Sequence, residues 1–569
     1  AVGSGSLDAN TTGENNVAVG MHALTANTTA DENTAVGAYA LADNTTGTRN
    51  TAVGLYSLIA NTTGNNNTGV GRSALQANTT GYDNVAIGRS SLDANTTGYA
   101  NVSVGESSLT SNTTGYRNTA VGQNSMAACT TGLENTAVGQ NSLNDLTTAN
   151  YNVAVGQNAL AACTTGAGNV GIGINALDAV TTQGGNTVIG YNAASALVTT
   201  GVTAIGYQAM VSSTTGYDTV AIGQSALTSN TTGNENVAVG YNAMYSNTTG
   251  NDNVAIGNGA LDTSTTASDT VAIGRNAGGA ITVGGGNTLV GAYAGQTMNG
   301  SNGKWNVAIG FNAMKDTDAR FQNTAVGQNA LSSNLAHGNA AVGAKCLEDN
   351  THGDGNNGFG YFCLSSCTTG DNNVAMGTSA GTNITTGSHN TIIGTGAAST
   401  LTTGSQCILI GREANVSGAG NAELVIGNTV AGQGNNTGKI YPPGGGAIYQ
   451  ATNGTTFAQT SDERIKKNIV DNNEGLNKLK DIQVRNFEYR TEEEVTELPN
   501  HLAVKQEGIQ LGVIAQEIEK VLPEVIKIES SGVKTVNTDN LTWYLINSVQ
   551  ELSAQVDELK QEIKNLKGE

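Results

Sequence analysis

Apolar and polar residues recur in one fixed order along the first three quarters of the chain. A short alternating stretch, Asn-(Thr/Val)-Ala-(Val/Ile)-Gly, begins at Asn16 and returns at Asn33, Asn50 and Asn84. In most units a leucine follows four residues after the glycine, as at Leu24, and an Asn-Thr-Thr-Gly run closes the unit. This alternation predicts a short β-strand that ends at a glycine with positive φ or a close backbone neighbour.

The repeat glycine returns every 17 residues from Gly3 to Gly190 and then, with a few steps of 16 and one of 19, continues to Gly427, which makes 26 copies. One unit holds too few apolar side chains to fold alone, so the copies must stack, at about 4.8 Å per coil. We therefore predict a mainly β chain with a β-solenoid shaft over residues 1–427, a rod of roughly 120 Å. The β-branched strand residues and the leucines are the expected inward positions.

Such a core is thin, which favours several chains that share one axis or pack side by side. The Asn-(Thr/Val)-Ala-(Val/Ile)-Gly element resembles the head repeats of trimeric autotransporter adhesins, which form trimeric left-handed β-rolls. Those repeats are shorter than 17 residues, so the resemblance covers only the strand motif and does not fix the handedness.

The last 109 residues differ in composition. Residues 1–460 hold 11 basic and 24 acidic residues, whereas residues 461–569 hold 14 and 21. This shift marks a domain boundary. Residues 428–460, with Tyr441-Pro442-Pro443, are expected to end the solenoid as its tip and to contact the host.

Two blocks of the tail carry a family resemblance. They are Ser461-Asp462-Glu463-Arg464-Ile465-Lys466 and Gly512-Val513-Ile514-Ala515-Gln516-Glu517-Ile518-Glu519. In this order they resemble the C-terminal intramolecular chaperone domain of phage tail spikes and tail fibres, over about residues 461–560. A helix near 474–480 and a strand near 484–489 are predicted between them, so residues 461–569 form a small α+β domain.

The resemblance implies a trimeric domain that aligns three chains and then releases itself by autoproteolysis. Its Ser–Lys dyad corresponds to Ser461 and Lys466. Ser461 would attack the carbonyl of Thr460, and the resulting ester would be hydrolysed by water. Lys466 would have to be neutral to take the hydroxyl proton, with Arg464 and Lys467 as the candidate cations that favour this form. A domain that folds and stays attached is the alternative.

The chain ends in a heptad pattern, which predicts a coiled-coil helix from about residue 545. Val549, Val556 and Ile563 occupy a positions, with leucines at d. This choice of residues by itself favours a dimer. The trimer rests on the chaperone resemblance.

Composition excludes several functions. The net charge of −20 argues against nucleic acid as a partner, and no apolar stretch is long enough to insert into a membrane. No cofactor fingerprint or His cluster predicts a cofactor or a metal site. A glycanase would need paired carboxylates in a groove, and the acidic residues of the repeats are scattered. Because the chain opens within a repeat, we expect a longer polypeptide whose N-terminal region attaches to the virion.

Three features allow competing interpretations. The Asn-Thr-Thr runs can be interpreted as turns whose side chains bond the backbone, as N-glycosylation sequons or as ice-binding ladders. The cysteines read as buried free thiols, although Cys346 and Cys363 lie on neighbouring coils and are within reach of a disulfide. Aromatic residues gather near Trp305, where packing in a swollen coil is favoured over a carbohydrate-binding groove.

The function that unites these features is a homotrimeric viral tail fibre of the virion that attaches to a host receptor, with a glycan as one candidate. Its C-terminal domain is expected to act as a chaperone and a single-turnover self-cleaving serine peptidase. A bacterial cell-surface trimeric adhesin is the alternative.

Overall fold

The computed structural model describes residues 1–298, 303–317, 320–418, 420–442, 448–450, 458–459, 463, 466–491, 493–497, 504, 506–529 and 532–568. The chain divides into two compact units, residues 1–460 and 461–569. The first is a β-solenoid, as predicted, and the second is a small α+β unit that ends in a long helix.

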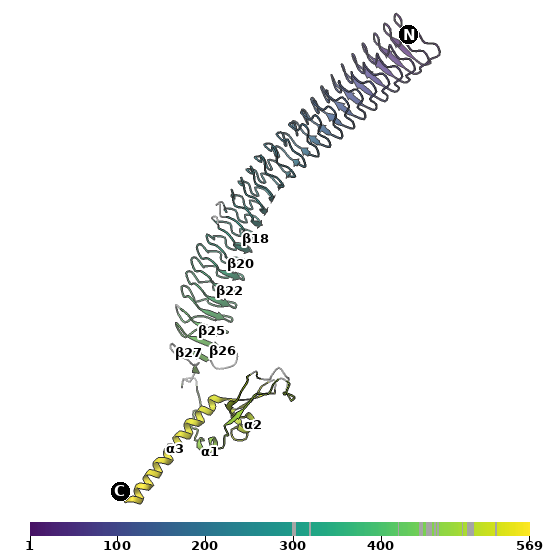
Figure 1. The fold of residues 1–569 in the computed structure, drawn as a ribbon. Helices are drawn as coiled ribbons and strands as arrows, with labels where there is room; N and C mark the ends of the chain where they lie inside the picture. Colours follow the sequence, from purple (N-terminus) through teal and green to yellow (C-terminus); the bar gives the residue numbers. More distant parts are fainter. Residues whose placement is uncertain are drawn as a thin grey trace. The chain divides into compact units, whose positions relative to one another are not determined.

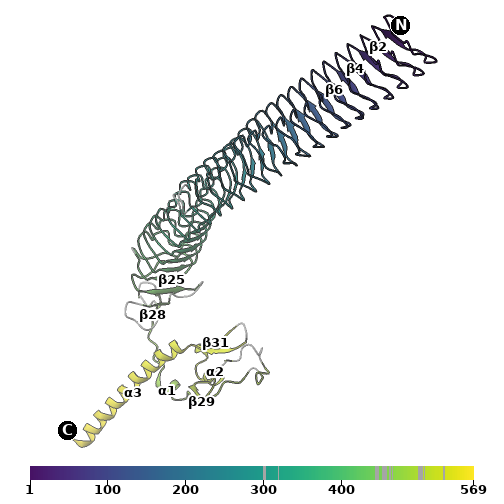
Figure 2. The same cartoon turned by 45° about the horizontal axis from the view of Figure 1, so that its top comes forward.

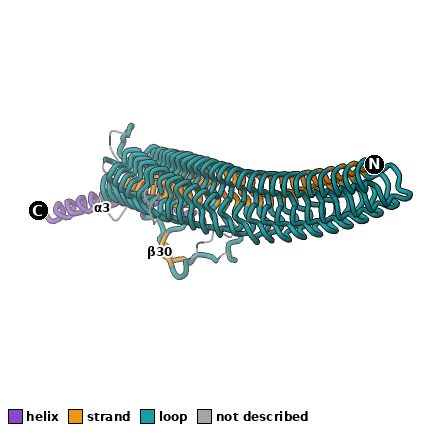
Figure 3. The backbone as a smooth tube through the Cα atoms, turned by 90° about the horizontal axis from the view of Figure 1, so that it is seen from above, coloured by secondary structure: helices purple, strands orange, loops and turns teal. Residues whose placement is uncertain are grey.

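Each coil of the solenoid contributes one short strand, and the strands follow one another in sequence (Figures 1 and 2). Neighbouring strands pair in parallel and in register, so that Ala18 lies beside Ala35 and Val19 beside Val36. Figure 3 shows the strands in one continuous row, with turns completing every coil. Equivalent residues therefore stack along the shaft, as the period predicts.

The strands of the first half are β1 Val17–Val19, β2 Thr34–Val36, β3 Thr51–Val53, β4 Thr68–Val70, β5 Val85–Ile87, β6 Val102–Val104, β7 Thr119–Val121, β8 Thr136–Val138, β9 Val153–Val155, β10 Val170–Ile172, β11 Thr187–Ile189 and β12 Thr203–Ile205. Those of the second half are β13 Val220–Ile222, β14 Val237–Val239, β15 Val254–Ile256, β16 Val271–Ile273, β17 Thr288–Val290, β18 Val307–Ile309, β19 Thr324–Val326, β20 Ala340–Val342, β21 Asn357–Phe359, β22 Val374–Met376, β23 Thr391–Ile393 and β24 Ile408–Ile410.

The strand faces are the reverse of our expectation. The middle residue of each strand points inward and is buried, as Ala35 is, while the β-branched residues on either side face outward. Val36 is 37% exposed. The prediction that Val and Ile fill the interior is therefore wrong. The middle position is Ala, Gly or Ser in most coils because it faces the leucine across a narrow interior.

The repeat glycine is required for both reasons that the sequence suggested. Gly20 has φ +135°, and a Cβ at this position would lie 2.5 Å from the carbonyl oxygen of Gly37 on the next coil. Leu24 and its equivalents are completely buried, and they form the inner column together with the strand alanines. The predicted inward position of the leucines is confirmed.

Buried asparagines form a ladder along the shaft, as the stacking of equivalent residues from coil to coil predicts. The side-chain amide of Asn44 donates to Oδ1 of Asn27 at 3.0 Å, and that of Asn61 donates to Oδ1 of Asn44 at 2.8 Å. The Asn44 amide also donates to the Gly47 carbonyl at 2.9 Å, which confirms the predicted turn chemistry. Because Asn44 is completely buried, its sequon is closed to a glycosyl group in this fold.

The solenoid ends where the sheet changes direction. Strand β25 (Leu424–Gly427) pairs in parallel with β26 (Gly438–Tyr441). Strand β26 then pairs antiparallel with β27 (Ile448–Gln450), which in turn pairs with β28 (Ala458–Gln459). The expected tip, residues 428–460, thus contains this antiparallel end, while Pro443 lies outside the described residues.

All six cysteines are free and buried in the shaft. Burial raises the pKa of the Cys129 and Cys163 thiols to about 11, because the thiolate would lose its hydration. The expectation of buried free thiols is confirmed, and Cys346 and Cys363 form no disulfide.

The C-terminal unit contains helices α1 (Leu476–Leu479), α2 (Ala515–Ile518) and α3 (Thr538–Lys567), and a 3-10 turn η3 (Pro523–Val525). The described residues of this unit also form two antiparallel hairpins: β29 (Arg485–Phe487) with β30 (Gln510–Gly512), and β31 (Ile526–Ile528) with β32 (Lys534–Val536). The predicted helix, strand and terminal helix are all present. No helix among the described residues is both long and apolar enough to cross a bilayer.

Candidate cleavage and assembly site

The predicted dyad lies at the start of the C-terminal unit. Thr460, Ser461 and Arg464 fall outside the described residues. Lys466 is exposed, and its backbone N–H donates to the Glu463 carbonyl at 3.0 Å. The catalytic roles of Ser461 and Lys466 stay predictions.

The segment that follows Lys466 is fixed to helix α3. The side-chain amide of Asn547 donates to the carbonyl oxygens of Asn472 and Glu474, at 2.7 and 3.2 Å. The carboxylate of Glu551 accepts from the backbone N–H of Leu476 at 2.9 Å and so caps α1. These bonds connect residues more than 70 positions apart, which couples the start of the unit to its terminal helix.

The second motif block has a structural role. Gly512 ends β30, where a Cβ would approach the Phe487 ring at 3.1 Å, and Ile518 on α2 is buried. Glu517 accepts two hydrogen bonds from the Arg485 guanidinium, at 3.0 and 3.1 Å, which ties α2 to β29. Glu519 binds Lys534 on β32. The block therefore joins both hairpins to one short helix.

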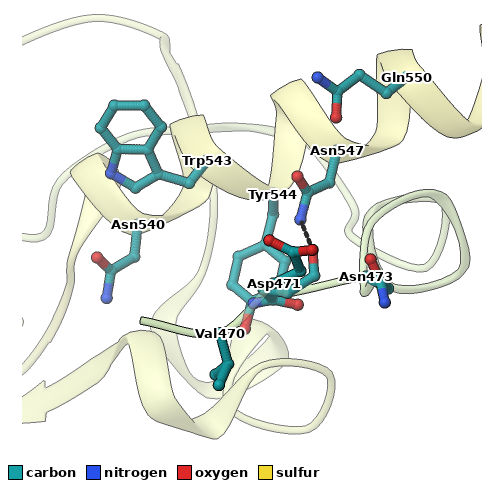
Figure 4. Close-up of a pocket in the computed structure, with 9 residues that line it drawn as sticks. Val470, Asp471, Asn473, Asn540, Trp543, Tyr544, Asn547 and Gln550 are labelled. Atoms are coloured by element: carbon teal, nitrogen blue, oxygen red, sulfur yellow. Dashed lines mark hydrogen bonds between the residues drawn. The ribbon is translucent and has the colours of Figure 1, made fainter. Parts of the chain in front are cut away.

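A polar hollow of about 640 Å³ lies between α3 and the segment that begins at Val470 (Figure 4). Trp543 and Tyr544 line the hollow from helix α3. Asn547, also on α3, donates a hydrogen bond to the carbonyl of Asn472 in the segment that begins at Val470. Trp543 is 63% exposed and Val470 is 84% exposed. The sequence analysis missed this site, although Trp543, as one of only two tryptophans, was a usable signal.

One charged contact beside this hollow has a clear electrostatic effect. The Tyr544 hydroxyl donates to Oε1 of Glu524 at 2.5 Å, which lowers the pKa of Glu524. The same bond raises the pKa of Tyr544, because its hydroxyl proton is held by the carboxylate. Helix α3 is thereby joined to η3.

The heptad residues of α3 have no partner within the described part of this chain. Their side chains are exposed, including the a residues Val549 and Val556. The helix begins earlier than expected, at Thr538, where the Asn537 side chain caps it by accepting from the backbone N–H groups of Asp539 and Asn540. An exposed apolar seam on a 30-residue helix is typical of a strand of a coiled coil.

Among the described residues, no group of three or more His, Cys, Asp and Glu side chains gathers as a metal site would require.

Comparison with known proteins identifies the C-terminal segment. Residues 461–527 match the family described as chaperone of endosialidase. This segment is therefore similar to chaperone-of-endosialidase domains. The match confirms the resemblance seen in the two motif blocks, and it ends at residue 527 rather than near 560. The chaperone domain thus includes the dyad positions, both strands of the first hairpin and α2.

Three phage proteins are similar to parts of the chain. Long tail fiber protein Gp37 of Enterobacteria phage Ox2 is 30% identical over 127 residues, which cover 22% of this chain and 45% of that protein. Its counterpart in Enterobacteria phage M1 is 29% identical over 127 residues, with the same coverage. That of Salmonella phage S16 is 29% identical over 166 residues, which cover 26% and 21%. The chain spans less than half the length of these relatives.

Proposed function

We propose that this protein is a homotrimeric phage tail fibre whose shaft attaches the virion to a host, and whose chaperone domain directs trimerisation and then cleaves itself off before Ser461. One observation carries the proposal: the family match and the second compact unit both begin at residue 461. Cleavage there would separate the C-terminal unit from the shaft. The three Gp37 relatives, named as long tail fibre proteins, support the place in the virion.

The outward face of the shaft sheet supports association of several chains. We define it as the first and third residues of strands β1 to β24, most of which are Val, Ile or Thr. Strands about 10 Å long, stacked at about 4.8 Å over these coils, give a face on the order of 1,000 Å². A monomer rarely exposes an apolar patch above about 600 Å². Three chains that turn this face to a common axis would cover it.

The exposed seam of α3 supports the same assembly at the other end of the sequence. Its β-branched a residues favour two strands by themselves, whereas the chaperone family implies three. The mass of the intact assembly distinguishes these stoichiometries directly. If the mass is that of a dimer, the trimeric state in the proposal is wrong, while the role as a tail fibre is unaffected.

The proposed cleavage needs no second reactant except water. The Ser461 hydroxyl gives its proton to Lys466 Nζ while Oγ attacks the Thr460 carbonyl carbon, and the Thr460–Ser461 amide bond breaks as its nitrogen takes that proton. The product is an ester between Thr460 and the Ser461 side chain. Water then hydrolyses the ester, leaving a carboxylate on Thr460 and the free hydroxyl and amine of Ser461. Each chain performs this reaction once.

The test is the intact mass of the purified full chain and of its Ser461→Ala and Lys466→Ala variants. We expect fragments of 460 and 109 residues from the wild type, and a chain of 569 residues from both variants. Lys480→Ala is the matched control, because Lys480 is an exposed lysine of the same unit. Unchanged cleavage in Ser461→Ala would contradict the mechanism. An uncleaved wild type would leave a chaperone that stays attached.

Host attachment is tested separately by adsorption. The trimeric wild-type protein is mixed with a panel of enterobacterial strains, because two of the relatives come from Enterobacteria phages. Retention on one or more strains supports attachment, and absence of retention on all of them counts against it.

A further inference from the structure

Trp305 lies on the outside of the shaft, where burial does not explain it. Its side chain is 63% exposed, so the interpretation that it fills a swollen coil is wrong. Trp305 stands five residues before the repeat Gly310, in a row that contains Asp269 and Gly286 on the two preceding coils. Solvation of an indole is unfavourable, and an exposed tryptophan beside a hollow is a feature of ligand sites.

A hollow of about 580 Å³ adjoins this indole. It opens because Gly286, which has no side chain, lies in register between Trp305 and Asp269. The backbone N–H of Gly286 donates to the Ser268 carbonyl at 2.9 Å, and that of Trp305 to the Gly285 carbonyl at 3.4 Å, so three coils are joined here. A Cβ on Gly286 would lie 2.8 Å from Cδ1 of Trp305, so the indole lies directly against the position where a side chain is missing.

Polar groups surround the hollow. The residues that line it are Thr266, Ser268, Asp269, Val283, Gly285, Gly286, Lys304 and Trp305. Among the described residues, no hydrogen bond or ion pair occupies the Asp269 carboxylate or the Lys304 ammonium. Ser268 Oγ accepts from the Asn251 backbone N–H at 3.1 Å and keeps its own proton to donate. The hollow therefore offers a flat apolar wall, an acceptor, a strong donor and hydroxyls.

This combination matches the surface of a pyranose ring, which has an apolar C–H face and hydroxyls along its edge. The indole would stack on the C–H face, while Asp269 and Lys304 would bond the hydroxyls. Residues 1–460 hold 24 acidic and 11 basic residues, so an anionic polymer would be repelled by the surrounding shaft. We propose that this hollow is a binding subsite for a neutral hexopyranose of a surface glycan, an inference that rests on the proposed host attachment and identifies its ligand class.

The test is binding of the intact protein to an array of neutral and acidic oligosaccharides. We expect retention on neutral hexose-containing glycans, and at least tenfold weaker binding in Trp305→Ala, because truncation of a stacked tryptophan removes much of a site's affinity. Asp269→Asn should weaken binding less. Tyr151→Ala is the matched control, since Tyr151 occupies the same repeat position with 60% exposure, and it should leave binding unchanged.

Fluorescence gives a second readout on the same protein. The chain has two tryptophans, so a Trp543→Phe background leaves Trp305 as the only indole. The neutral glycan that the array retains best should change its emission, and acidic glycans should not. Retention of no neutral glycan, or equal retention by wild type and Trp305→Ala, would overturn the proposal.

The outcomes separate this inference from the proposed function. If the protein adsorbs to bacteria but binds no neutral glycan, the subsite fails and host attachment stands. If it binds glycans through Trp305 but adsorbs to no strain, the subsite stands and the proposed attachment fails.

Discussion

The shaft and the C-terminal unit bury their apolar residues in opposite ways. In the shaft most coils place an alanine and a leucine in an interior closed to solvent, and buried asparagines bond from coil to coil. In the described part of the C-terminal unit, the buried cluster consists of Ile518, Leu522 and Val525. The α3 seam and Trp543 stay exposed.

This difference divides the requirements of assembly between the two units. A coil of the shaft fits any neighbouring coil, because the repeats are nearly equivalent, so the shaft alone sets its register weakly. The C-terminal unit has a unique sequence and apolar surface that one chain leaves uncovered. Under the proposed function it is therefore the part suited to bring chains together in a single alignment before the shafts associate.

The largest expected effect comes from the α3 seam. Replacing Val556 and Leu559 by aspartate puts charges into the apolar seam, and we expect complete loss of the oligomer when the mass of the full chain in solution is measured by light scattering. Ala554→Asp, at an outer f position, is the control and should keep the oligomer. An oligomer that survives the double substitution would show that the shaft assembles unaided.

The shaft should respond to substitution locally and by a smaller amount. Leu75 is completely buried, and Leu75→Ala leaves a cavity that should lower the free energy of unfolding of the surrounding coils by about 2–5 kcal/mol. Leu55→Ala, on the exposed surface, should change it by about 0.5 kcal/mol or less. Hydrogen exchange of the coils on either side measures both. Equal effects of Leu75→Ala and Leu55→Ala would contradict a shaft interior built from stacked, buried leucines.

The sequence predicted the solenoid because strict repetition leaves one solution: like residues stack. It failed on which strand face points inward, because alternation fixes that Val17 and Val19 share a face but not which face. The informative signal was the small size of the side chain at the middle strand position, which is Ala, Gly or Ser in most coils and so fits a narrow interior. A wide interior would not require this restriction.

The candidate site could be predicted only in part. Motif spacing predicted the chaperone domain, and the family match agrees. The dyad of Ser461 and Lys466 stays a prediction. The contacts of Asn547 with Asn472 and Glu474 join segments far apart in the sequence, so no local pattern contains them. The hollow beside Trp305 arises from the absence of a side chain at Gly286, one coil away. Only the three-dimensional register brings such pairs together.

The smallest effect concerns pH, and it separates the units by the chemistry of their contacts. The shaft ladders are neutral amides, whereas Glu524 of the C-terminal unit accepts from Tyr544, which lowers its pKa. A carboxyl with a lowered folded pKa stabilises above its unfolded pKa of about 4.3, and this contribution is lost as the pH falls through the folded pKa.

Tyr544→Phe should therefore lower the stability of the C-terminal unit at neutral pH by about 1 kcal/mol or less, because the contact is largely exposed. The gap between variant and wild type should close as the pH falls from the unfolded pKa of about 4.3 down through the lowered folded pKa of Glu524. Urea unfolding of the uncleaved Ser461→Ala chain, followed by the fluorescence of Trp543 in a Trp305→Phe background, measures it. Tyr489→Phe, on an exposed tyrosine of the same unit, is the control. A stability difference that persists in acid would mean that Tyr544 acts through packing and not through its bond to Glu524. This contact would then give no difference in pH response between the shaft and the C-terminal unit.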